Sequence, residues 1–348
     1  MQSVEHNWRQ FLKAIGYKKT GPIDREDSLQ DITLTTPSAT GYDLLVKINA
    51  VSVNPVDTKV RQRQEPEEGG WVVLGFDAVG IVEAVGSEVK DFKAGDAVFY
   101  AGALNRPGTN SEYHLVDERL VGHAPTSLSN AEAAALPLTA ITAWEMLFHR
   151  LDVNRPTAQG ANIILIIGGA GGVGSIAIQL LRAMTNITVI ATASRPETQE
   201  WVRECGAHHV IDHHQPLAPQ IDKLGLGAPG FVFSTTNTDT HLVDIVELIA
   251  PQGRFGVIDD PANFSASPFK RKSVSLHWEL MFTRSLFGTP DMAEQGKVLN
   301  QITALVDAGK IRSTVTNVAG KIDAANLRAV HAHIETGSSR GKTVLEGF

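Results

Sequence analysis

The chain has 348 residues, of which 43% are hydrophobic and 20% charged, and its formal net charge at pH 7 is −7. This composition is typical of a globular protein with two sizeable cores, and the acidic charge argues against a nucleic-acid or anionic-membrane surface. The single cysteine, Cys205, excludes an internal disulfide framework and a four-cysteine zinc site. Since no stretch has the pattern of a signal peptide or a membrane span, we expect a cytoplasmic protein.

The first third of the chain is strand-like. Short apolar runs at 44–48, 80–85 and 96–100 lie between turns rich in Gly, Pro and Asp, which is typical of a compact β-rich domain. At Ser129 the pattern changes to an alanine-rich helix, for which Ser129 is a suitable N-cap. We therefore assign residues 1–128 to a first domain.

Strands and helices alternate in the middle of the chain. This alternation predicts a parallel, doubly wound α/β sheet within residues 129–285. The C-terminal part, 286–348, begins with a helix and ends in short strand-like pieces, so we expect it to rejoin the first domain. The predicted strands of the sheet are 163–167, 187–192, 209–211, 231–234, 254–258 and 274–278.

A glycine-rich stretch directly follows the first of these strands and opens a helix. Gly169, Gly171 and Gly174 fit the pattern G-x-G-x-x-G, in which glycines allow a tight turn, close approach of a pyrophosphate and close helix packing. The phosphates would meet the free N–H groups of the helix N-terminus. The sequence therefore predicts a dinucleotide site, with a purely structural turn as the alternative. The predicted contacts are Gly169, Ala170, Gly171, Gly172, Val173 and Gly174.

The end of the next strand indicates which dinucleotide is bound. NAD sites usually carry an Asp or Glu there that accepts hydrogen bonds from the ribose, but this strand ends Ala193-Ser194-Arg195. Arg195 offers a planar fork of donors to a phosphate dianion and Ser194 offers a hydroxyl. The sequence therefore favours NADPH. The alternative is that Arg195 is only a solvated residue at the start of the next helix.

Five ordered motifs carry a family resemblance. They lie at 53–57, 75–80, 134–144, 168–174 and 337–345. Together they resemble the medium-chain dehydrogenase/reductase superfamily, in its quinone oxidoreductase-like and zinc-type alcohol dehydrogenase-like branch, from Phe11 onward. The resemblance implies a Rossmann-type cofactor domain, a GroES-like substrate domain and a homodimer formed along the edge strand at 274–278.

The sequence departs from the zinc enzymes of that superfamily at the catalytic metal. Those enzymes have a cysteine where this chain has Asn54, a histidine and a glutamate at Phe76 and Asp77, and a second cysteine at Leu138. Zinc is held in a tetrahedral array of thiolate, imidazole or carboxylate ligands, which Asn, Phe and Leu cannot supply. We therefore expect no bound metal.

The resemblance also implies roles for individual residues. Asn54 would lie beside the nicotinamide and donate its amide to the substrate oxygen, and Thr142 would bring its hydroxyl to the nicotinamide. His213 stands where related quinone reductases have a tyrosine against the 2′-phosphate. Backbone groups of Val257 and Ile258 would contact the carboxamide, and Phe282 and Thr283 are expected to do so from the opposite side.

Three polar residues have competing interpretations. Tyr100 is either a donor or apolar wall of the substrate site, or a buried core tyrosine. Lys342 either approaches the cofactor or forms a surface salt bridge. Asp57 is better explained as the cap of the helical turn at 58–61 than as a proton donor. No residue stands where a dedicated general acid is required.

The expected lack of a metal restricts which reactions the protein can catalyse. Alcohol oxidation becomes hard, because nothing lowers the hydroxyl pKa, whereas hydride transfer to a conjugated acceptor needs only hydrogen-bond donors and a proton. We therefore predict a zinc-independent, NADPH-dependent reductase of a small quinone or α,β-unsaturated carbonyl. An NADP-dependent alcohol or carbonyl dehydrogenase and a non-catalytic NADPH-binding protein stay open as alternatives.

Overall fold

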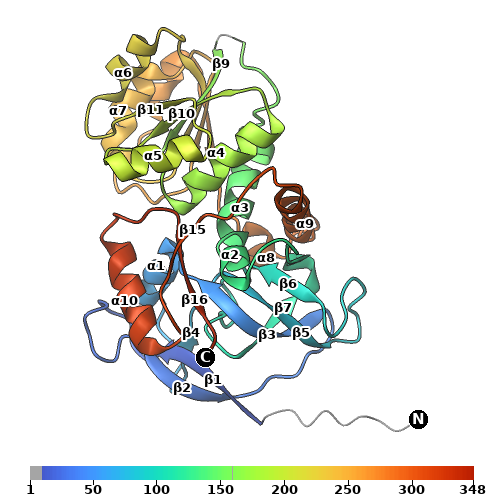
Figure 1. Cartoon of the computed structure of the whole chain (residues 1–348). Helices are drawn as coiled ribbons and strands as arrows, with labels where there is room; N and C mark the ends of the chain where they lie inside the picture. The colour runs from blue at the N-terminus through green and yellow to red at the C-terminus, as the bar shows by residue number, and fades with distance from the viewer. Residues whose placement is uncertain (1–9, 159) are drawn as a thin grey trace. The chain divides into compact units, whose positions relative to one another are not determined.

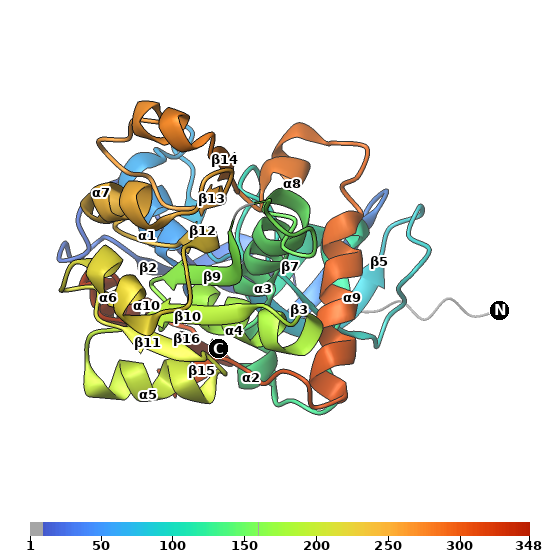
Figure 2. The same ribbon diagram turned by 90° about the horizontal axis from the view of Figure 1, so that it is seen from above.

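The computed structural model describes residues 10–158 and 160–348. The chain forms two compact units, and each is described by itself (Figure 1, Figure 2). The first unit contains the chain up to Leu138, Phe282–Asp307 and Val315–Phe348, and the second contains Thr139–Met281 and Ala308–Thr314.

The crossing between the units differs from the predicted boundary. It lies after Leu138 rather than after residue 128, so helix α2 (Asn130–Ala134) belongs to the first unit. Ser129 caps this helix as predicted, because its hydroxyl and the Glu132 carboxylate form a capping box. The small side chains of Ala131, Ala133 and Ala134 are buried, which lets α2 pack closely on the strands of the first unit. The alanine-rich pattern marked a helix correctly, but not the unit to which the helix belongs.

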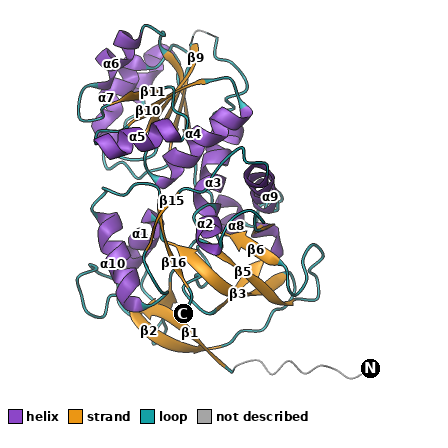
Figure 3. Cartoon of the chain, in the orientation of Figure 1, coloured by secondary structure: helices purple, strands orange, loops and turns teal. Residues whose placement is uncertain are grey.

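Two β-sheets form the frame of the first unit (Figure 3). A three-stranded sheet has the order β2-β1-β4, and a seven-stranded sheet has the order β15-β16-β3-β5-β6-β8, with β7 paired to β3. The strands are β1 (Phe11–Tyr17), β2 (Gln30–Thr35), β3 (Asp43–Ser52), β4 (Val72–Val73), β5 (Ala78–Val85), β6 (Ala97–Tyr100), β7 (Tyr113–Asp117), β8 (Val121–His123), β15 (Val315–Val318) and β16 (Lys342–Glu346). The helices are α1 (Pro55–Arg63), α2, α8 (Thr283–Phe287), α9 (Glu294–Asp307) and α10 (Ala324–Glu335).

Strand β16 brings the end of the chain into the middle of this sheet. It runs antiparallel to β3, with Val344 opposite Ser52 and Leu345 opposite Val51. When this register is continued past the end of β3, Lys342, the first residue of β16, lies opposite the start of α1. Val344 and Leu345 are fully buried, so burial of this apolar pair helps to hold the register.

The second unit is a parallel sheet of six strands, which confirms the predicted doubly wound α/β fold. Its order is β11-β10-β9-β12-β13-β14. The strands are β9 (Ala161–Ile167), β10 (Thr188–Thr192), β11 (His209–Ile211), β12 (Pro229–Ser234), β13 (Arg254–Val257) and β14 (Ser275–Trp278), and the helices α4 (Gly172–Met184), α5 (Pro196–Glu204), α6 (Leu217–Leu224) and α7 (Thr238–Leu248) connect them. Helix α3 (Pro137–Trp144) contains the crossing point from the first unit.

The sheet of the second unit is buried on both faces. Alternate residues of β9 point to opposite sides, and Ile163, Leu165 and Ile167 pack into one core with apolar residues of α6 and α7. Helix α4 contacts β9 and β10. The continuous apolar run at 163–167 is therefore explained by a central strand covered on both faces. Within the described residues, no helix is both long and apolar enough to cross a membrane.

Candidate functional site

The glycine turn between β9 and α4 is shaped as its sequence predicts. Gly168 has a φ of 80°, and a Cβ there would lie 2.3 Å from Thr235 Oγ1. A Cβ on Gly174 would lie 2.4 Å from the Gly168 carbonyl oxygen. Both positions therefore need glycine for packing alone. Gly168 belongs to the motif at 168–174 but not to the predicted contacts, and its positive φ is what makes glycine necessary there.

Gly171 differs from Gly168, Gly169 and Gly174, where a Cβ would lie 2.3–2.8 Å from a neighbouring atom. A Cβ at this position would have the Gly168 oxygen as its nearest neighbour, at 3.5 Å, so packing in the protein would accept a side chain there. Gly171 is the N-cap of α4, and the following N–H groups of Gly172, Val173 and Gly174 form the first helical turn, where amides have no partner within the helix. A glycine not required by packing, next to such amides, leaves room for a phosphate group.

The predicted 2′-phosphate residues lie beyond the end of β10. Arg195 is the N-cap of α5, and its Nε forms an ion pair with Glu197 Oε1 at 2.9 Å. The Arg195 side chain is 41% exposed, so this pair is weak and the guanidinium can turn toward an incoming phosphate. Ser194 is half-buried beside it. Glu197, which the sequence analysis overlooked, is the competing partner of the predicted phosphate ligand.

His213 follows β11 and lies among other histidines. Its ring packs edge-on against His214 at 4.8 Å and lies 6.4 Å from His241, between ring centroids. Its Nδ1 is buried without a hydrogen-bond partner, and burial lowers the pKa of His213, with the neighbouring His214 and His241 adding to the effect. The ring is therefore expected to be neutral at pH 7, with Nδ1 available to a ligand.

Several predicted cofactor residues end up at one edge of the second unit's sheet. In a parallel sheet the carboxyl ends of all strands meet at the same edge, so the glycine turn, Ser194, His213 and Val257 lie there together. The Val257 carbonyl already accepts the Glu279 N–H at 3.2 Å, and the Ile258 N–H donates to the Ser234 carbonyl at 3.3 Å. The backbone groups expected to contact the carboxamide thus have partners within the unit.

Thr142, Phe282 and Thr283 are divided between the two units. Thr142 lies on α3 in the second unit and is 5% exposed. Phe282 and Thr283 belong to the first unit, where the Phe282 ring packs edge-on against Phe76 at 5.3 Å between centroids and Thr283 begins α8. These three assignments stay predictions.

In the first unit, a buried polar cluster joins residues from three distant parts of the chain. The Lys342 ammonium donates to the Val53 carbonyl at 2.9 Å, to Asp77 Oδ2 at 3.2 Å and to Asn54 Oδ1. The Asn54 Nδ2 donates to Asp77 Oδ2 at 2.8 Å. The side chains of Lys342 and Asp77 are 4% and 0% exposed. We call Asn54, Asp57, Asp77 and Lys342 the polar cluster.

Local structure fixes one end of the cluster. Asn54 is the N-cap of α1, and Pro55 at the first helical position is pre-set for the helix. Asp57 Oδ2 accepts the Asn54 backbone N–H at 2.8 Å, and Asp57 Oδ1 accepts the Gly75 N–H at 3.0 Å. The sequence predicted Asp57 as the cap of a turn at 58–61, but the helix begins earlier, at Pro55, so the N-cap is Asn54 and Asp57 completes the capping box from the third helical position. The carboxylate also ties the helix to the loop that carries Asp77.

Burial dominates the electrostatics of the polar cluster. It raises the pKa of Asp57 to about 7 and raises the pKa of Asp77, while the Lys342 ammonium opposes both shifts. Burial lowers the pKa of Lys342, and the two carboxylates oppose that change. Neither Lys342 nor Asp77 would be stable in this position as an isolated charge, so each depends on the other.

Two sequence interpretations are corrected here. Lys342 does not form a surface salt bridge, because its ion pair with Asp77 is buried. Its predicted approach to the cofactor stays a prediction, and it would require one of its three hydrogen bonds to be given up. Tyr100 is a core residue, fully buried, with its hydroxyl 3.0 Å from His114 Nδ1 and its ring stacked on the His114 ring. Asn54 has less freedom than expected, because its amide nitrogen donates to Asp77 and, at 3.4 Å, to the Ser52 carbonyl. Donation to a substrate would have to replace one of these bonds.

The positions at which the family resemblance expects zinc ligands lie together, but the side chains present there do not fit zinc. Asp77 accepts the Leu138 N–H at 2.7 Å through Oδ1 and contacts Asn54 through Oδ2. Asp77 is the one carboxylate in this set, and it already neutralises the Lys342 ammonium. Over residues 10–158 and 160–348, no group of three His, Cys, Asp or Glu is arranged to hold a metal ion.

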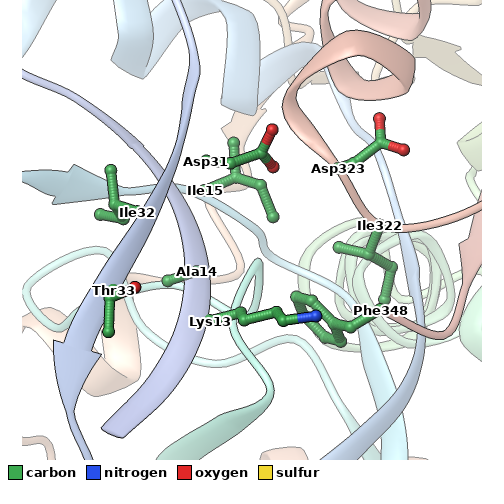
Figure 4. Close-up of a pocket in the computed structure, with 9 residues that line it drawn as sticks. All are labelled: Lys13, Ala14, Ile15, Asp31, Ile32, Thr33, Ile322, Asp323 and Phe348. Carbon is green, nitrogen blue, oxygen red and sulfur yellow. The ribbon is translucent and has the colours of Figure 1, made fainter.

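A separate cavity of about 360 Å³ lies on the first unit between the β1–β2 pair and the end of the chain (Figure 4). Asp31, in its lining, accepts the Ala324 backbone N–H through Oδ1 at 3.0 Å, so this carboxylate binds the first amide of α10, whose N-cap is Asp323. None of the predicted site residues lines the cavity. It is lined by Lys13, Ala14, Ile15, Asp31, Ile32, Thr33, Ile322, Asp323 and Phe348.

Comparison with known proteins identifies the family. Residues 40–126 match the alcohol dehydrogenase GroES-like domain, and residues 172–301 match the zinc-binding dehydrogenase domain. A zinc-type alcohol dehydrogenase-like protein of Staphylococcus epidermidis is 38% identical over 96% of this chain and 99% of its own length. The human mitochondrial NAD(P)H oxidoreductase RTN4IP1 is 31% identical over 87% of this chain and 81% of its own length.

Solved structures agree with this assignment. A Rhizobium etli protein assigned to the zinc-dependent alcohol dehydrogenases is 61% identical, with a TM-score of 0.96 over 98% of this chain and 99% of its own. A Pseudomonas syringae quinone oxidoreductase is 25% identical (TM-score 0.80; 96% and 99% covered), as is a mycobacterial protein complexed with NADPH (TM-score 0.78; 96% and 99% covered). The chain is therefore an oxidoreductase of the medium-chain dehydrogenase/reductase superfamily and belongs with its zinc-type alcohol dehydrogenase-like proteins.

Proposed function

We propose that this protein is an NADPH-dependent reductase of quinones or α,β-unsaturated carbonyls and that it works without zinc. The observation that carries the proposal is the buried Lys342–Asp77 pair: Asp77 stands at a position where the family resemblance expects a zinc ligand, and its pairing with Lys342 leaves no ligand set for a Lewis acid. The structural relatives include a quinone oxidoreductase and a complex with NADPH, which support the proposed substrate class and the proposed cofactor.

The residues present in the second unit fit a nicotinamide dinucleotide. The turn at Gly171 and the first-turn amides of α4 would bind the pyrophosphate, and Arg195, Ser194 and His213 would bind the 2′-phosphate. When bound, NADPH supplies the hydride.

The chain's own groups then act by binding and orientation. Arg195 would exchange its pair with Glu197 for the doubly charged phosphate, and the neutral His213 ring would add a hydrogen bond through its buried nitrogen. In the first unit, Lys342 and Asp77 hold the two ends of the Asn54 amide, so its orientation is fixed. Asn54 would be the donor for the acceptor oxygen in this proposal, releasing the longer bond to Ser52.

The test of the reaction class is an acceptor panel. Initial rates of NADPH oxidation would be measured with quinones, enals and enones, with and without a chelator, beside NADP⁺ reduction with primary and secondary alcohols. We expect turnover with conjugated acceptors that does not change with chelation. Alcohol-dependent, chelator-sensitive activity would instead support an alcohol dehydrogenase, and tight NADPH binding without turnover across the panel would support a non-catalytic protein.

Cofactor preference gives a prediction at Arg195. The change Arg195→Ala is expected to raise the KM for NADPH by roughly 10- to 100-fold, because a hydrogen-bonded charge pair with the phosphate is worth about 1.5–3 kcal/mol. The KM for NADH should stay nearly constant. The matched control is Glu197→Gln, which removes the competing carboxylate and should lower the KM for NADPH. Equal losses for both cofactors in R195A would contradict the role given to Arg195.

The edge of the second unit's sheet gives a prediction about assembly. β14 is the last strand of the sheet, and Trp278 on it is 54% exposed. An exposed apolar edge strand is a template for pairing with a second chain. We propose a homodimer formed along β14. Trp278→Lys should shift the protein to a monomer in analytical ultracentrifugation, while Val243→Lys, at an 81% exposed position on α7, should not. A monomeric wild type would refute the proposal.

A further inference from the structure

The polar cluster has an unusual charge arrangement for the interior of a protein. A lysine ammonium has three N–H donors. The ammonium of Lys342 is surrounded by three oxygen acceptors: the Val53 carbonyl, Asn54 Oδ1 and Asp77 Oδ2. No donor of this ammonium is left for another role. The group is thus coordinated by oxygens from several directions, in the way that a bound cation would be.

The place of this ammonium in the fold is as informative as its contacts. Asn54 and Asp77 stand at two of the four positions where the family resemblance expects metal ligands, and Asp77 also accepts the N–H of Leu138, a third such position. Phe76, at the fourth, is buried beside Asp77 and turns an apolar ring toward Phe282. The residues that replace metal ligands therefore still converge, and the positive charge among them now comes from β16.

We propose that the Lys342 ammonium is a built-in cation that fills the former metal position, and that the oxygens around it form a binding site for a monovalent ammonium ion. This site would take a primary alkylammonium when Lys342 is shortened, and it would not take zinc while Lys342 is present.

The charge balance of the cluster explains the choice of a monovalent cation. Asp77 faces Lys342 directly, whereas both carboxylate oxygens of Asp57 accept backbone N–H groups, from Asn54 and Gly75. One ammonium therefore balances one carboxylate. A divalent ion among the same groups would carry an excess charge in a buried place, and the Asn54 amide and Val53 carbonyl are weak ligands for zinc.

Chemical rescue tests the proposal. Lys342→Ala deletes the four terminal heavy atoms of the side chain, and propylammonium has the same four atoms. We expect propylammonium chloride to raise the Tm of K342A by about 2–4 °C relative to equal sodium chloride, because a ligand that binds only the folded state stabilises it. 1-Propanol, which has the same shape without the charge, should have no such effect. An equal effect of propanol, or none from the amine, would overturn the proposal.

Two further samples complete the design. Lys47→Ala removes an exposed lysine from β3, and its Tm should not respond to propylammonium. If K342A is recovered only as aggregate, refolding yield with and without the amine replaces Tm as the readout. Lys342→Met combined with Asp77→Asn removes both charges and should fold without responding to the amine.

The metal arm of the test uses the wild type. After dialysis against zinc and removal of excess ion, wild type and Asp77→Asn are expected to contain equal zinc. One equivalent of zinc in wild type that D77N lacks would overturn the proposal. Because neither the amine nor the metal measurement involves turnover, a failed acceptor panel would leave this inference standing. A failed amine rescue would leave the proposed reductase activity standing, whereas zinc bound by the wild type would overturn both this inference and the zinc-independence of the proposed function.

Discussion

Replacing Lys342 with methionine is expected to lower the free energy of unfolding of the first unit by about 3–5 kcal/mol, the usual cost of leaving one partner of a buried ion pair without the other. Methionine fills a similar volume, so the loss comes from the unpaired charge rather than from a cavity. In K342M the Asp77 carboxylate would stay buried without its cation, and Asn54 Oδ1 and the Val53 carbonyl would lose their donor.

A double-mutant cycle with Asp77 separates the pair from its surroundings. Adding Asp77→Asn to K342M removes the orphaned charge, so the double variant should be more stable than K342M alone. Urea denaturation followed by circular dichroism measures each stability. Lys93→Met is the matched control: Lys93 pairs with Asp96 at 3.1 Å but is 83% exposed, so its loss should cost less than about 1 kcal/mol. Equal costs for K342M and K93M would contradict the buried-pair account.

The second large effect is expected at the glycine turn, because the protein leaves space for a Cβ at Gly171 but not at Gly174. Gly171→Ala should weaken NADPH binding on the order of a hundredfold, about 3 kcal/mol, while stability changes little, since a Cβ there meets no protein atom closer than 3.5 Å. Gly174→Ala should reduce both binding and stability, because its Cβ would lie 2.4 Å from the Gly168 oxygen.

Fluorescence titration with NADPH and thermal unfolding measure the two properties separately. Loss of binding without loss of stability in G171A would show that the missing side chain leaves space for a ligand. A G171A protein that binds NADPH as well as wild type would contradict the phosphate site, and the turn would then have only a structural role. Comparison with G174A guards against mistaking a folding defect for a binding defect.

Features that depend on near neighbours were predictable from the sequence. The strand before the glycine turn, the helix after it and the N-cap at Ser129 are set by periodicity, glycine conformation and capping within a few residues. The doubly wound sheet followed from the alternation of such elements. The unit to which α2 belongs could not be predicted in this way, because α2 packs on strands that are distant in the sequence.

The sequence by itself determined the parallel sheet, the glycine turn and the lack of an acid after β10, and it shows Asn54, Phe76 and Leu138 where the family resemblance expects metal ligands. Only the tertiary structure decided the role of Lys342. That residue lies 265 positions from Asp77, and the antiparallel register of β16 on β3 brings it to the start of α1. No local pattern records such a pairing, because a buried charge becomes stable only when folding places its counter-charge beside it.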